Sequence, residues 1–137
     1  MKVLAFDCAG NACAAALVRA GAVLAQRLTR LERGHAQLLA PMIEAVMKEA
    51  GTRFSDLDLI AVTTGPGSFT GVRIGLATAR GLALAADCPL VGVTSFAAIA
   101  AGIAPLADLN LVVAVDSKRA EFYVQAFGPD GAALTPP

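Results

Sequence analysis

The sequence predicts an α/β protein in which a mixed β-sheet is flanked by helices, followed by the truncated start of a second, related lobe. Short apolar runs bounded by turn residues indicate strands. Two longer segments with apolar residues at every third or fourth position indicate helices. The arrangement strand, aspartate, turn, strand also occurs twice, which is typical of a duplicated architecture. The expected order of elements in the first lobe is β-β-β-α-β-α-β-α.

Three apolar segments near the N-terminus are expected to form strands, at residues 3–6, 13–18 and 22–28. Asp7 ends the first of them, and small or polar residues that favour tight turns separate the three. Because consecutive strands joined by tight turns pair in opposite directions, these segments predict an antiparallel meander.

The first helix is expected at residues 35–50, where apolar side chains recur at helical spacing and Gly51 provides a stop. Pro41 has no backbone N–H and is expected to kink the first turns of this helix. The second helix is expected at residues 70–86, directly after a Gly-Pro-Gly loop.

Shorter elements surround the second helix. A strand is expected before it at residues 57–63 and another after it at residues 90–93, and a short helix follows at residues 95–101. These elements complete the first lobe.

The second copy of the strand, aspartate, turn, strand arrangement lies near the C-terminus. An apolar run at residues 111–116 ends in an aspartate, and a second strand is expected at residues 121–127. Two strands cannot bury their apolar faces on their own. We therefore expect an N-terminal lobe in residues 1–106 and only the first strands of a second, incomplete lobe in residues 107–137.

The composition excludes several classes of protein. Lys plus Arg and Asp plus Glu number 11 each, so the chain lacks the cationic field that a free-standing nucleic-acid binder needs. Cys8, Cys13 and Cys88 are odd in number and have no CxxC spacing, which argues against a disulfide framework or a zinc site and favours a reducing compartment. The start is interrupted by Asp7 and does not resemble a signal peptide, and no apolar stretch is a convincing membrane span. The expectation is a soluble, cytoplasmic protein with no membrane contact.

Three polar residues are candidates for contact with a phosphate or a nucleotide. The Gly-Pro-Gly loop leads into a helix N-terminus, whose free N–H groups attract anions, although the lysine of a P-loop is missing. Two aspartates end apolar strands, where a carboxylate can reach a magnesium-bound phosphate. The alternatives are a rigid loop with a helix cap, and carboxylates that hydrogen-bond their own turns. The candidates are Asp7, Ser68 and Asp116.

His35 is the only histidine of the chain. A metal-binding histidine pair is therefore impossible, and no nucleophile is recognisable beside His35 in the sequence. We expect no catalytic residue, and no metal or cofactor bound by this chain alone.

The two long helices are candidates for a protein interface. Gly71 and Gly75 lie four residues apart and nearly on one face, which favours close approach of another helix, although close packing inside the lobe would explain them equally well. The first helix is apolar around more of its circumference than one sheet contact requires. The expected interface comprises Leu38, Leu39, Met42, Val46, Thr70, Gly71, Arg73, Ile74, Gly75, Thr78 and Leu82.

Several motifs resemble one known family. They lie at residues 3–7, 35–41, 65–75, 81–83 and 89–93, and the likeness extends to about Phe127. They are similar to the TsaB family, which supplies the non-catalytic subunit of the bacterial system that places threonylcarbamoyl on adenosine 37 of tRNA. The resemblance implies an actin-like ATPase (ribonuclease H-like) fold with two related lobes.

The resemblance also implies partners. The first-lobe helices would pair with the catalytic paralogue, TsaD, or with a second copy of the chain, and an ATPase, TsaE, would work with the complex. ATP or ADP and metal would belong to the partner subunits, and tRNA would be reached only through the complex. The family is sometimes described as glycoprotease-like, but no protease constellation is present. The alternative from another class is a degenerate actin-fold phosphotransferase or hydrolase with activity of its own.

Overall fold

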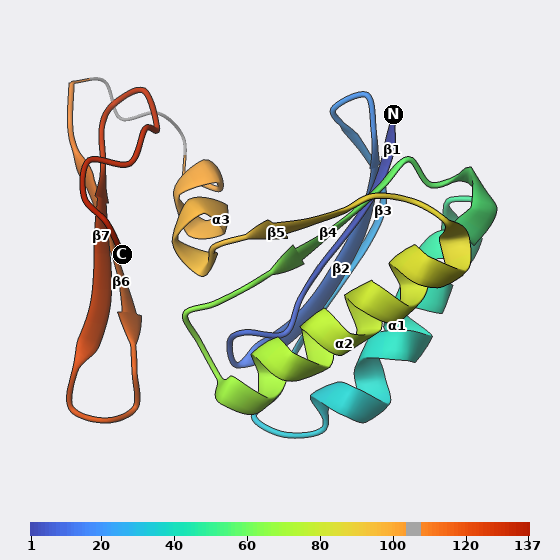
Figure 1. Cartoon of the computed structure of the whole chain (residues 1–137), viewed down its shortest axis with the longest axis horizontal. Helices are drawn as coiled ribbons and strands as arrows, with labels where there is room; N and C mark the ends of the chain where they lie inside the picture. The colour runs from blue at the N-terminus through green and yellow to red at the C-terminus, as the bar shows by residue number, and fades with distance from the viewer. Residues whose placement is uncertain (104–107) are drawn as a thin grey trace.

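The computed structural model describes residues 1–103 and 108–137, and it has the predicted α/β class and order of elements (Figure 1). The strands and helices differ from the expected ranges by only one or two residues at their ends. The elements are β1 (Lys2–Asp7), β2 (Ala12–Arg19), β3 (Ala22–Arg30), α1 (His35–Glu49), the 3₁₀ turn η1 (Phe54–Asp56), β4 (Leu59–Thr63), α2 (Phe69–Ala86), β5 (Leu90–Val93), α3 (Ser95–Ala101), β6 (Leu111–Asp116) and β7 (Phe122–Phe127).

The first five strands form one mixed sheet with the order β3-β2-β1-β4-β5. β1, β2 and β3 pair antiparallel, which confirms the predicted meander, and β4 and β5 extend the sheet in parallel from β1. Parallel neighbours need long connections, and here α1 and α2 provide them.

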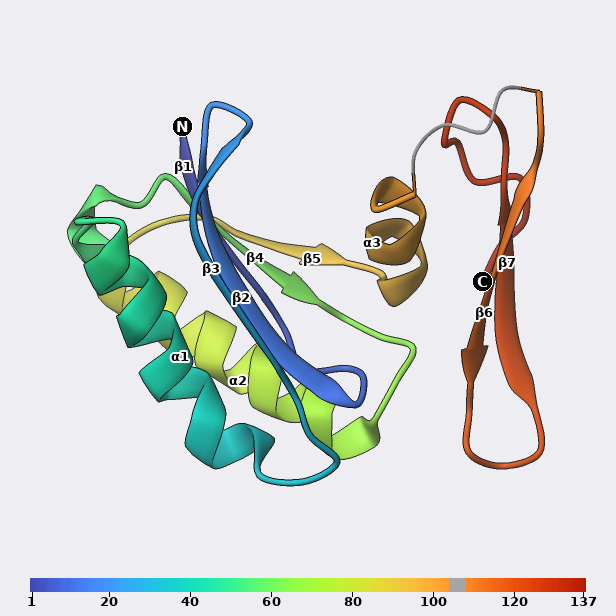
Figure 2. The ribbon, with the colours of Figure 1, turned by 180° about the vertical axis from the view of Figure 1, so that it is seen from behind.

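Both long helices cover the same face of this sheet, and the two views show α3 and the β6–β7 hairpin on the other side (Figures 1 and 2). Alternation along the strands directs large side chains toward the helices, where Leu4, Phe6, Leu17, Ile60 and Val62 are buried in one core. The opposite face of the same strands is lined by small alanines and lies open in the described residues.

α1 runs without interruption through Pro41, the residue that was expected to kink its first turns. The helix begins after Gly34, whose φ of 92° is favourable for glycine, and no side chain caps it. Its buried stripe contributes large residues to the core: Leu39, Met42, Ile43, Val46 and Met47.

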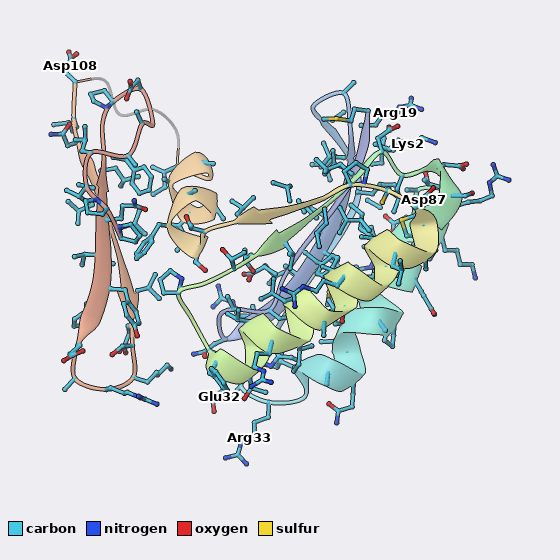
Figure 3. All side chains as sticks on the ribbon, viewed as in Figure 1. Lys2, Arg19, Glu32, Arg33, Asp87 and Asp108 are labelled. Carbon is cyan, nitrogen blue, oxygen red and sulfur yellow. The ribbon has the colours of Figure 1, made fainter. Side chains whose placement is uncertain are left out.

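α2 begins at Phe69, one residue earlier than predicted, and Ser68 caps it. The Ser68 Oγ accepts a hydrogen bond from the Gly71 N–H at 3.2 Å. The helix ends at Ala86, and Asp87, which follows it and is labelled in Figure 3, adopts a left-handed conformation with φ 51°.

β6 and β7 form a separate two-stranded antiparallel sheet. It packs on α3 through a small cluster of Phe96, Val113 and Phe127, while Val112 and Phe122 remain exposed. The proposed lobe boundary between residues 106 and 107 lies outside the described residues, and the division into lobes stays a prediction. Within the part of the chain that the structure describes, no helix has both the length and the apolar character needed to cross a membrane.

Candidate functional site

The outward side of α2 presents apolar and cationic side chains. Phe69 is 74% exposed and Leu84 is 85% exposed, which is unusual for large apolar residues on one helix. The Arg73 guanidinium stacks over the Phe69 ring, with its central carbon 5.1 Å from the ring centroid. We define the outer face of α2 by its exposed residues Phe69, Thr70, Arg73, Ala77, Arg80 and Leu84.

The fully buried positions of α2 are occupied by glycine and alanine, with the half-buried Ile74 and Leu82 beside them. Gly71, Gly75 and Ala79 are buried. A side-chain carbon added at Gly71 would overlap the carbonyl oxygen of Cys8, and one added at Gly75 would lie 3.4 Å from Cγ2 of Val62. The expectation that these glycines meet a partner helix is therefore wrong, because they let α2 approach its own sheet.

Three of the predicted interface residues on α1 also belong to the core. Leu39, Met42 and Val46 are at most 5% exposed, and they pack against the sheet. They cannot contact a partner while the lobe is folded, so their assignment to an interface is wrong. The outward positions of α1 are occupied by small or polar residues such as Gln37 and Glu44.

The other predicted interface residues differ in exposure. Thr70 and Arg73 are exposed on the outer face of α2. Thr78 is half-buried, and the remaining three are half-buried and pack against the core. Those three are Leu38, Ile74 and Leu82. Their part in an interface stays a prediction.

A cleft of about 940 Å³ adjoins the N-terminal end of α2. It lies between the Gly-Pro-Gly loop and the turn after β6, and its polar lining includes Ser68, Arg73, Asp116, Lys118 and Arg119. Two of the three phosphate candidates therefore share this cleft. The third, Asp7, lines a different cavity of about 560 Å³ on the open face of the sheet.

Each phosphate candidate has a local hydrogen-bonding role. The Asp7 Oδ1 accepts a hydrogen bond from the Ala9 N–H at 2.7 Å and another from the Thr63 hydroxyl. The Asp116 Oδ1 accepts one from the Lys118 N–H at 2.7 Å. The two aspartates therefore close equivalent turns, which agrees with the sequence repeat and with the alternative that each carboxylate binds its own turn.

His35 also has a structural role. Its Nε2 lies 3.1 Å from the carbonyl oxygen of Gly10, and because a carbonyl can only accept, Nε2 must carry the proton. The bond ties the start of α1 to the loop between β1 and β2. In residues 1–103 and 108–137, no three His, Cys, Asp or Glu side chains form a group that could hold a metal.

The exposure of Phe69 and Leu84 was not predicted from the sequence. The signal was present in the helical periodicity, because both lie on the side of α2 opposite to Gly71 and Gly75. The periodicity shows which residues share a side of α2, but it predicts their exposure only when the side that faces the sheet is known.

Known proteins with the same sequence pattern and architecture identify the family. The family model described as "TsaD: tRNA N6-adenosine threonylcarbamoyltransferase" matches residues 22–133. The chain is 38% identical to the tRNA threonylcarbamoyladenosine biosynthesis protein TsaB of Escherichia coli over 124 residues, which make up 90% of this chain and 53% of that protein. The chain thus spans about half the length of this relative.

Two solved structures share the fold. YeaZ from Pseudomonas aeruginosa superimposes with a TM-score of 0.86 at 33% identity, over 96% of this chain and 62% of that one. The ROK hexokinase from Thermus thermophilus superimposes with a TM-score of 0.59 at 22% identity, over 98% of this chain and 49% of that one, and shows a shared fold only. These likenesses confirm the predicted actin-like fold. The chain therefore belongs to the family that the TsaD model describes, and its similarity to TsaB over nine-tenths of its length confirms the resemblance seen in the sequence.

Proposed function

We propose that this chain is a non-catalytic scaffold or activating subunit in the biosynthesis of N6-threonylcarbamoyladenosine at position 37 of tRNA. In this role it docks on a TsaD-like catalytic paralogue in the cytoplasm. The similarity to proteins named for this biosynthesis supports the pathway. The balance of 11 cationic and 11 anionic residues supports contact with tRNA through the complex and not through this chain alone.

The observation that supports docking is the outer face of α2. Phe69 and Leu84 are among the most exposed large apolar side chains of the described residues, and they lie on one helix. Burial of both against a partner helix would remove apolar surface from water, at about 25 cal/mol per Å². Arg73 and Arg80 flank them and can pair with acidic side chains of the partner.

The same face can pair with a second copy of the chain when the catalytic paralogue is absent. In a two-fold homodimer the same patch of both copies forms the interface, so the apolar residues of this face would pack on one another. We expect the homodimer and the heterodimer to exclude each other, since both would bury Leu84.

The test of docking compares two charge substitutions at equally apolar, exposed positions. Leu84→Lys alters the outer face of α2, and Leu28→Lys alters β3, where Leu28 is 66% exposed. Each variant is mixed with a TsaD protein, and the complex is measured by size-exclusion chromatography and calorimetry. We expect Leu84→Lys to weaken binding at least about tenfold, as at interface hot spots. Leu28→Lys should bind as the unaltered chain does.

Equal binding by both variants would contradict docking through α2. Equal loss of binding by both would point to a less specific apolar contact, and would also contradict it.

The alternative of an enzyme with its own phosphotransferase or hydrolase activity rests on the cleft beside Ser68 and Asp116. It requires that the isolated chain binds nucleotide. We expect calorimetric titration with ATP and magnesium to show no binding, because Asp7 is engaged by Ala9 and Thr63 and does not line that cleft. Binding that is lost in Asp116→Asn would favour the enzyme.

A further inference from the structure

Two cysteines face each other where the β1–β2 pair ends. Asp7 and Ala14 form the last paired position of that ladder, so Cys8 and Cys13 occupy the next opposite positions. Their sulfur atoms lie 3.3 Å apart, and both side chains are at most 1% exposed. Opposite Cα atoms in an antiparallel pair are about 4.5–5.5 Å apart, within the range of about 4.4–6.8 Å that a disulfide spans.

This pair lies directly beneath the start of α2. The carbonyl oxygen of Cys8 packs against Gly71, so closely that no side chain would fit there. The carbonyl oxygen of Ala9 accepts a hydrogen bond from the Ser68 N–H at 2.7 Å. A change in the conformation of the Cys8–Cys13 segment would therefore alter the contacts that hold the N-terminus of the proposed docking helix.

Burial keeps the two thiols unreactive while the segment is closed. Desolvation raises the pKa of both the Cys8 and the Cys13 thiol above the ordinary value. Since the thiolate is the reactive form, little of it is present in the closed state. Gly10 and Asn11 between the two cysteines are exposed, and the segment opens when the hydrogen bonds that their carbonyl oxygens accept from His35 and from the Leu31 N–H break.

We propose that Cys8 and Cys13 are an oxidisable dithiol that a peroxide converts into an intramolecular disulfide beneath α2. This site is independent of the proposed docking function. When the segment opens, one thiolate attacks a peroxide oxygen and becomes a sulfenic acid, and the peroxide O–O bond breaks. The second thiol then attacks the sulfenic sulfur, the S–S bond forms, and water leaves. In sum, two thiols lose two electrons and two protons, and hydrogen peroxide is reduced to two water molecules.

The disulfide would restrain the loop that supports α2. The sulfur atoms must move from 3.3 Å to about 2.05 Å apart. That link removes the open conformations of the segment, so the bond from Ser68 to Ala9 should break less often. The oxidised protein should therefore hold the start of α2 more firmly than the reduced protein does.

Peptide mapping tests the disulfide without any substitution. Trypsin cleaves after Lys2 and Arg19, so one peptide, residues 3–19, contains Cys8 and Cys13 but not Cys88. The folded protein is treated with hydrogen peroxide, and its free thiols are then alkylated. After trypsin digestion, the masses of the peptides are measured by mass spectrometry. We expect this peptide to be unalkylated and about 2 Da lighter than the dithiol form, and to be restored by dithiothreitol.

A peptide with both cysteines alkylated would overturn the proposal, and so would a cross-link from this peptide to Cys88 or to another chain. The Cys88→Ala variant serves as the matched control, because Cys88 is outside the pair and should not affect the 2 Da loss.

Hydrogen exchange tests the restraint on α2. We expect the Ser68 amide to exchange about tenfold more slowly in the oxidised protein than in the reduced protein, because opening of the segment limits its exchange. Unchanged or faster exchange in a protein whose disulfide has been verified would contradict the restraint. Neither measurement depends on a partner, so failure of the docking proposal would not affect the result.

Discussion

The helices α1 and α2 cover the same face of the sheet, but they contact it with different kinds of residue. α1 inserts large side chains such as Leu39 and Val46 into the core and leaves small or polar residues outside. α2 lies on the sheet with Gly71, Gly75 and Ala79 and leaves Phe69 and Leu84 outside. The core therefore takes its fully buried large side chains from α1, whereas the fully buried positions of α2 carry only glycine and alanine and its larger core contacts are half-buried. Two neighbouring apolar helices can therefore have different roles: α1 fills the core, and α2 leaves large apolar side chains exposed.

The largest expected effect is on α1. Leu39→Ala removes a fully buried side chain and leaves a cavity, and we expect the free energy of unfolding to fall by about 3 kcal/mol. Leu38→Ala, at the neighbouring half-buried position, is the matched control and should cost about 1 kcal/mol. Urea unfolding followed by circular dichroism measures both. Equal losses of unfolding free energy in the two variants would contradict the inward orientation of Leu39 on α1.

The next effect is on the inner side of α2, where addition of a methyl group should be harmful. In Gly71→Ala the new carbon meets the Cys8 carbonyl oxygen, so the backbone must shift, and we expect a loss of about 2–3 kcal/mol. The better helix propensity of alanine offsets only about 1 kcal/mol of this strain. The same urea titration measures the change, and a stabilised Gly71→Ala protein would contradict the close approach of α2 to the loop after β1.

A smaller effect is expected one turn further along α2. In Gly75→Ala the added carbon lies 3.4 Å from a Val62 methyl group, at the edge of ordinary contact. Helix propensity favours alanine by about 1 kcal/mol, so we expect stability to be unchanged or to rise by up to that amount. The difference in melting temperature between Gly71→Ala and Gly75→Ala, measured by calorimetry, separates strain from propensity. Gly75→Arg, in contrast, should unfold the lobe, because the charged side chain would enter the core.

The smallest effect on stability is expected at the outer face of α2. Leu84→Lys replaces an exposed side chain on a helix, and we expect the free energy of unfolding to change by less than about 0.5 kcal/mol. Chemical unfolding in the absence of any partner measures this. A large loss would mean that Leu84 already packs within the chain, and the weaker partner binding predicted for this variant would then have a trivial cause.

The local patterns predicted the elements well, because they depend on neighbours in the sequence. The tight turn after Asp7, the stop at Gly51 and the cap at Ser68 act within a few residues of where they stand. The repeat of Asp7 and Asp116 was likewise visible, and the structure adds that both carboxylates accept the N–H two residues ahead. The candidate site was predicted less well, since the glycines and three α1 residues turned out to face inward.

The sequence by itself determined the α/β class, the order of strands and helices, and the family resemblance, because each depends on spacing along the chain. Only the tertiary structure decided which side of each helix faces the sheet. α2 has apolar residues around most of its circumference, from Phe69 through Ile74 to Leu84, so periodicity does not select a buried face. The selection is made by fit: the carbonyl of Cys8 leaves room only for a residue without a side chain at position 71, and Val62 leaves room for little more than a methyl group at position 75.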